Sequence, residues 1–167
     1  MTERQDDPAA TLACYADGPA QLAAALAGLR QAGLDLGPAG GGWTIRQIAH
    51  HIADGDDLWG GCVKMALGSE TGFSLQWYWA RSQDEWAEVW HYAERDLEPS
   101  LAVFRANRAH IVQLVGQVPD AWGRHMRLQM RDGSESCITV GEIIAGQAEH
   151  ALGHIADIRA IRETHHI

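Results

Sequence analysis

Three histidines on two separate segments of the chain have the spacing to bind one metal ion. The first lies in Trp43–Asp54, WTIRQIAHHIAD, and the other two, His150 and His154, lie in Glu149–Asp157, EHALGHIAD. Residues four apart in a helix share a face, so His150 and His154 are expected to stack. Imidazole nitrogens bind divalent metals at ~2.0–2.1 Å, and three protein ligands leave a position open for water or substrate. The pattern therefore favours a catalytic rather than a structural metal site.

The first segment carries two adjacent histidines, His50 and His51, and they are not equivalent. In a helix, neighbouring residues point about 100° apart, so the two fall on opposite flanks of the apolar stripe. That stripe consists of Ile45, Ile48, Ala49, Ile52, Trp59 and Val63. The flank of His50 is charged, with Arg46, Asp54 and Asp57, whereas the flank of His51 continues with Leu58 and Cys62. We expect His50 and Asp54 to be solvated and His51 to face the inside of the fold.

The last helix is expected to present His150 and His154 to the same side. Its apolar stripe consists of Val140, Ile144, Gln147, Ala151, Ile158 and Ile161. His154 falls inside this stripe and His150 at its edge, whereas Glu149 points away. Gln147 lies one turn before His150 and could donate a hydrogen bond to a metal ligand, or it could be a buried amide bonded to a neighbouring helix.

Simpler explanations exist for the same residues. A histidine pair four residues apart arises easily by chance in a chain with nine histidines. Cys62 is expected to be a small buried residue rather than a nucleophile. Most of the seven tryptophans are expected to pack in the core, although some between Trp77 and Trp90 could line a substrate pocket or a dimer face.

The elements that must position the histidines are helices. Apolar periodicity predicts four long helices, and three Ser/Thr-to-Gln/Glu capping boxes mark helix starts at Thr44, Ser82 and Thr139. The long helices are expected at 8–33, 45–67, 99–117 and 140–163. A small extra helix is expected near 83–95 and a short hairpin around 126–130. The sequence thus predicts an all-α, antiparallel four-helix bundle, formed by residues 1–167 as a single domain.

Composition excludes several classes of protein. The chain has 46% hydrophobic and 21% charged residues, which is typical of a globular protein. Its net charge of −9 opposes nucleic-acid binding, because phosphate backbones are repelled. Three widely spaced cysteines form neither a disulfide framework nor a CxxC site. With no signal-peptide pattern and no apolar run of ~18 residues, we expect a cytoplasmic protein with no membrane partner.

The two histidine segments also resemble the DinB/YfiT-like metalloenzyme family. Trp43 followed eight residues later by His51-Ile52-Ala53-Asp54 is similar to the family's motif on its second helix. His150 and His154 are similar to the HxxxH on its last helix, and the resemblance extends over nearly the whole chain. It implies a four-helix bundle in which His51, His150 and His154 hold one divalent metal ion, nickel or zinc. The segment Leu75–Arg95, with its WYW cluster, departs from the pattern.

The resemblance also implies an activity on a small molecule. Relatives of this type transfer a low-molecular-weight thiol to an electrophile, and others are named hydrolases. We therefore expect a thiol transferase, with a metal-dependent hydrolase that activates water as the alternative. A non-catalytic metal- or ligand-binding module of a stress response is the third possibility, and a homodimer is compatible with each.

Overall fold

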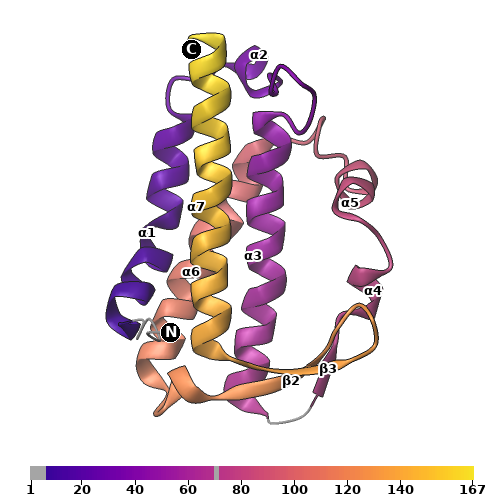
Figure 1. Cartoon of the computed structure of the whole chain (residues 1–167). Helices are drawn as coiled ribbons and strands as arrows, with labels where there is room; N and C mark the ends of the chain where they lie inside the picture. The colour runs from indigo at the N-terminus through magenta and orange to yellow at the C-terminus, as the bar shows by residue number, and fades with distance from the viewer. Residues whose placement is uncertain (1–6, 70–71) are drawn as a thin grey trace, which may run out of the picture.

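Four long helices form a bundle in the computed structural model, which describes residues 7–69 and 72–167 (Figure 1). They are α1 (Pro8–Leu26), α3 (Ile45–Gly68), α6 (Leu97–Gln117) and α7 (Val140–His165). The shorter helices are α2 (Gln31–Leu34), α4 (Gln76–Trp79), α5 (Gln83–Val89) and the 3-10 turn η1 (Ala121–Gly123). The strands are β1 (Gly72–Ser74), β2 (His125–Gln129) and β3 (Glu135–Thr139). The predicted all-α four-helix bundle is confirmed.

The connections set the directions of the helices. α3 and α7 run in opposite directions, as expected for an antiparallel bundle. α3 and α6 instead run in the same direction, which the sequence did not predict, since Ser100 lies beside His50 and Arg108 beside Asp56. The chain must therefore return along the outside of α3 before α6 begins. Figure 1 shows this return as an arm that contains α4 and α5, to the right of α3. The arm places aromatic side chains beside α3.

Local sequence signals explain most helix ends. All three predicted capping boxes form, at the starts of α3, α5 and α7. The first long helix was predicted to extend to about residue 33, but it ends at Leu26. The chain turns at Gly28, whose φ of 79° is left-handed. The extra helix α5 is also shorter than predicted and ends at Val89.

A polar layer crosses the middle of the bundle between two apolar clusters. At its centre the guanidinium of Arg108 forms a 2.8 Å ion pair with Asp56, and both side chains are almost completely buried. Arg108 also donates to the backbone oxygens of Tyr15 and Gln147, at 2.7 and 2.8 Å. Because these bonds reach α1, α3 and α7 from α6, the layer ties all four long helices together.

Two residues of α1 make room for this arginine. Pro19 has no N–H to donate to the Tyr15 oxygen four residues earlier, and Arg108 supplies that donor instead. Gly18 has no side chain, and a Cβ there would overlap the guanidinium of Arg108. The Gly-Pro pair thus accommodates the buried ion pair.

The small sheet closes one end of the bundle (Figure 1). β2 and β3 form the predicted antiparallel hairpin, and β1 adds a parallel strand next to β2 that the sequence did not predict. Within the described residues, no helix is both long and apolar enough to traverse a lipid bilayer.

Candidate metal centre

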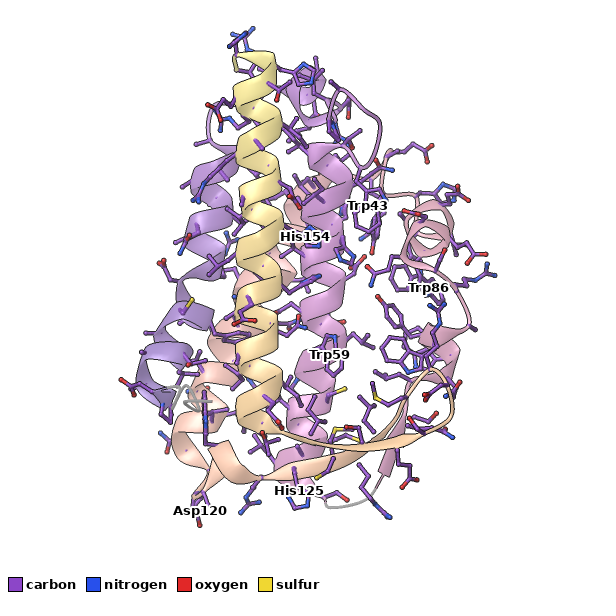
Figure 2. The ribbon with its side chains drawn as sticks, viewed as in Figure 1. Trp43, Trp59, Trp86, Asp120, His125 and His154 are labelled. Atoms are coloured by element: carbon purple, nitrogen blue, oxygen red, sulfur yellow. The ribbon has the colours of Figure 1, made fainter. Side chains whose placement is uncertain are left out.

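Two capped helices bring the three predicted histidines together. The capping box at Thr44 fixes the start of α3, and His51 follows two turns later with only 5% of its surface exposed. His150 and His154 lie one turn apart on α7, both partly buried. Figure 2 shows His154 where α7 faces α3, at the level of Trp43. The antiparallel pair α3 and α7 thus supplies every member of the cluster.

The imidazole rings form a compact triangle. Their ring centroids are 4.7–4.9 Å apart in each of the three pairs. The Nε2 atoms of His51 and His150 are 2.9 Å apart, and one nitrogen from each histidine fits within 4.8 Å of the others. Among residues 7–69 and 72–167 this is the one group of three such side chains that could hold a metal ion.

The electrostatics of the triangle suit a cation. Burial, together with the neighbouring imidazoles, lowers the pKa of His51 to about 3. Burial, with His154 and Arg108, lowers the pKa of His150 to about 4. Both rings are therefore neutral at pH 7, which is the form that binds a metal. Because nitrogens bonded at ~2.0–2.1 Å to one tetrahedral ion would be roughly 3.3 Å apart, the donor set fits a divalent metal after small side-chain movements.

An outer contact orients one ring of the cluster. The Nδ1 of His154 is 3.1 Å from a carboxylate oxygen of Asp157, which can only accept, so Nδ1 carries the proton and Nε2 is free. Such a carboxylate partner is the usual neighbour of a metal-binding histidine. Asp157 was not predicted from the sequence, although its position three residues after His154 in a helix could have indicated the contact.

Trp43 covers the same cluster from the start of α3. Its ring lies 4.7 Å from that of His51, edge to face, and 6.4 Å from that of His154, stacked. Its indole N–H donates a 2.7 Å hydrogen bond to Asp84 on α5. The arm that carries α5 is therefore attached to the residue that shields the histidines.

His50 lies outside the cluster, but the prediction that it is solvated is wrong. Its side chain is completely buried, with Nδ1 2.8 Å from the hydroxyl of Ser100 and the ring stacked on Tyr92. The N-terminal end of α6 and the residues before it cover this flank of α3. Asp54 is likewise only partly exposed, because it pairs with Arg95 at 3.4 Å.

Gln147 makes neither of the contacts expected for it. Its side-chain oxygen is buried, without a hydrogen-bond partner among the described residues. Its backbone oxygen instead accepts a hydrogen bond from Arg108. The polar layer therefore lies about one helical turn from His150. Glu149 is exposed, as predicted.

The other conspicuous side chains are structural. Cys62 is fully buried, and burial raises its pKa to about 11, so its thiol is not a nucleophile at neutral pH. Several tryptophans are partly buried, whereas Trp77 is 53% exposed. In the arm, Tyr78 stacks on Trp86 and Trp86 on Trp90, so these aromatic rings pack mainly on one another.

Comparisons with known proteins agree with this geometry. The family model of the DinB superfamily matches residues 15–158. A protein of Geobacillus thermodenitrificans named "Putative metal-dependent hydrolase" is 25% identical, over 96% of this chain and 86% of its own. One of Oceanobacillus iheyensis, "Putative metal-dependent hydrolase OB0782", is 27% identical, over 77% of this chain and 70% of its own.

A solved structure has the same fold. YfiT from Bacillus subtilis, described as "a probable metal-dependent hydrolase with an unusual four-helix bundle topology", superposes with a TM-score of 0.82. It is 21% identical, and the match covers 98% of this chain and 90% of YfiT. Since the family model spans most of the sequence, the chain belongs to the DinB superfamily.

Proposed function

We propose that this member of the DinB superfamily is a metal-dependent hydrolase, in which His51, His150 and His154 hold one divalent ion, nickel or zinc. The observation that carries the proposal is the triangle of three imidazoles, with one nitrogen of each within 4.8 Å of the others. The names of the relatives favour hydrolysis over other uses of such a site. The substrate class that follows is a small molecule with an ester or amide bond.

The side chains of the chain would prepare the site for this reaction. His51 and His150 stay neutral because burial lowers the pKa of each. Asp157 holds Nδ1 of the His154 ring, which leaves Nε2 available as a ligand. Trp43 packs against the rings of His51 and His154. A bound divalent ion would supply Lewis-acid chemistry, which polarises a carbonyl group and makes water a nucleophile near neutral pH.

Two alternatives use the same residues. Thiol transfer, which the sequence favoured, would use the open position for a thiolate, but no relative described above is named for it. A non-catalytic site would need a fourth protein ligand, since structural zinc is normally held by four. Within the described part of the chain, the group that could bind a metal has three members. A homodimer, a cytoplasmic location and a role in a stress response remain predictions.

Metal analysis combined with a turnover assay tests the proposal. Protein purified without an affinity tag should contain one divalent ion per chain, and it should hydrolyse some members of a panel of activated esters and amides. His154→Ala should lose both properties, because one ligand of three is gone. His110→Ala, which removes an exposed histidine of α6, is the matched control and should keep both.

Cobalt substitution separates the alternatives. If adding a small thiol produces strong near-ultraviolet charge-transfer absorption and transfer to an electrophile, while no ester or amide turns over, the chain is a thiol transferase. If neither reaction occurs and the cobalt spectrum does not respond to any added ligand, the metal is structural. Either result would replace the hydrolase proposal.

A further inference from the structure

A hollow of about 320 Å³ opens directly beside the histidine cluster. It lies between the loop that precedes α3 and the C-terminal half of α7. Most of its wall is apolar and is formed by Pro38, Ala39, Trp43, Ile48, Ala160 and Ile161. Its polar lining comes from α7, where His154, Asp157 and Thr164 face it. The volume is at the lower end of the ~300–1,000 Å³ that ligand pockets span.

The hollow shares two residues with the candidate metal centre. His154 forms part of its wall and part of the imidazole triangle. Trp43 also lines it and touches the rings of His51 and His154. A group held in this hollow therefore lies next to the place where a metal would bind.

Two other hollows formed by the described residues lack this connection. One is lined by Asp120 and His125, which Figure 2 shows at the opposite end of the bundle from Trp43. Another, between α3 and the arm, is lined by Asp54 and Trp90 but by none of the three histidines. Of these three hollows, the one at His154 has a position that relates it to the proposed chemistry.

We propose that this hollow binds an uncharged, apolar alkyl or acyl group, which, if the proposed hydrolytic function holds, belongs to the substrate. Apolar walls favour apolar chains, and each methylene buried in them should tighten binding about fourfold. The carboxylate of Asp157 at the wall, together with the net charge of −9, disfavours a ligand that carries a terminal carboxylate. Specificity for a neutral chain of limited length follows from the walls and the volume.

Binding can be measured without turnover and without metal. The indole N–H of Trp43 gives its own signal in a ¹H–¹⁵N spectrum, which Trp43→Phe identifies by its loss. Titration of the metal-free protein with acetamide, butanamide and hexanamide should move this signal, with a Kd that falls about fourfold per methylene until the hollow is full. The analogue of hexanamide with a terminal carboxylate should bind at least tenfold more weakly.

Filling the hollow provides the matched pair of variants. Ala160→Phe places a ring in the hollow and should abolish the response to hexanamide, and the smaller Ala160→Leu should weaken it and shift the preference to shorter amides. Ala106→Phe makes the same change at an exposed alanine of α6 and should leave binding unchanged. Circular dichroism checks that each variant is folded.

Failure of this inference and failure of the hydrolase proposal give different results. If hexanamide leaves the Trp43 signal unmoved, or moves it equally in Ala160→Phe, the assignment of the hollow is wrong even where esters are hydrolysed. If the amides bind as expected but the metal-loaded protein cleaves no ester or amide, the hollow is an apolar ligand site and the hydrolase proposal fails. An equal or tighter Kd for the carboxylate analogue would refute the preference for an uncharged chain.

Discussion

Replacing His50 and, separately, its neighbour His51 with alanine should produce two different defects. His50 is completely buried, bonded to Ser100 and stacked on Tyr92, and none of its contacts is to the imidazole triangle. His51→Ala removes one of the three candidate ligands. We expect His50→Ala to keep one metal ion per chain but to be less stable, and His51→Ala to lose stoichiometric metal binding.

The size of the His50 effect follows from its contacts. Loss of the hydrogen bond to the buried hydroxyl of Ser100, which then keeps only its 3.3 Å bond from Arg95, costs about 1 kcal/mol. The space left by the ring adds about 2 kcal/mol, at the lower end of large-to-alanine changes in cores. A loss of about 3 kcal/mol should lower Tm by roughly 6–12 °C in a chain of this size.

Two measurements on the same variants test the prediction. Thermal unfolding in a chelator reports the stability of the metal-free protein, and equilibrium dialysis with zinc reports the stoichiometry. His50→Gln, which can still bond to Ser100, should recover part of the lost stability. The reasoning is refuted if folded His50→Ala binds no metal, or if His51→Ala still binds one equivalent.

Three further predictions concern the groups around the cluster. First, the pKa values of about 3 for His51 and 4 for His150 lie below the ordinary 6.5, so the unfolded state takes up protons first as pH falls. The free energy of unfolding of the metal-free protein should therefore fall below about pH 6.5, by about 2 kcal/mol per histidine at pH 5. Urea unfolding at about pH 6.5 and at pH 5 would measure this loss. Second, Asp157→Asn should lower zinc affinity by about 10- to 100-fold in competition dialysis without changing the fold. Third, Arg108→Met should cost about 3–5 kcal/mol in urea unfolding, because it leaves Asp56 buried without its partner. Adding Asp56→Leu should recover only part of that loss, because the Tyr15 oxygen still lacks the donor that Arg108 supplied.

Each of these predictions has a clear contrary result. The pH effect should shrink in the His51→Ala/His150→Ala double variant, although the raised pKa of Asp56, about 6, acts in the opposite direction. An unchanged pH profile would show that the two imidazoles do not titrate as described. If Asp157→Asn binds zinc with wild-type affinity, the Asp157 carboxylate does not orient His154. If the double variant of Asp56 and Arg108 is no more stable than Arg108→Met alone, the polar layer is not held by this pair.

The sequence predicted the bundle well because its helices carry local signals. The capping boxes at Thr44 and Thr139 placed the starts of α3 and α7 correctly, and these two helices carry the whole histidine cluster. The positions of His51, His150 and His154 followed from helix periodicity once the helices were known to be neighbours.

The remaining errors come from contacts between residues distant in sequence. The burial of His50 depends on Ser100, fifty residues later, which a helical wheel of one segment cannot include. The pairing of Asp56 with Arg108 is equally distant, so the sequence of α3 alone did not single out Asp56. Asp157, in contrast, could have been predicted from the sequence, because residues three apart in a helix lie on the same face and the contact needs no tertiary information.

The distance along the chain between His51 and His150 has a consequence for protein synthesis. α7 supplies two of the three imidazoles and follows every other helix and strand of the described structure. During synthesis, a chain that lacks α7 therefore contains one of the three candidate metal ligands, His51. One imidazole binds a divalent ion weakly, so the proposed metal site would not yet exist in such a chain. The proposed centre would assemble only when α7 docks between α1 and α3, so stoichiometric metal binding would indicate that folding is complete.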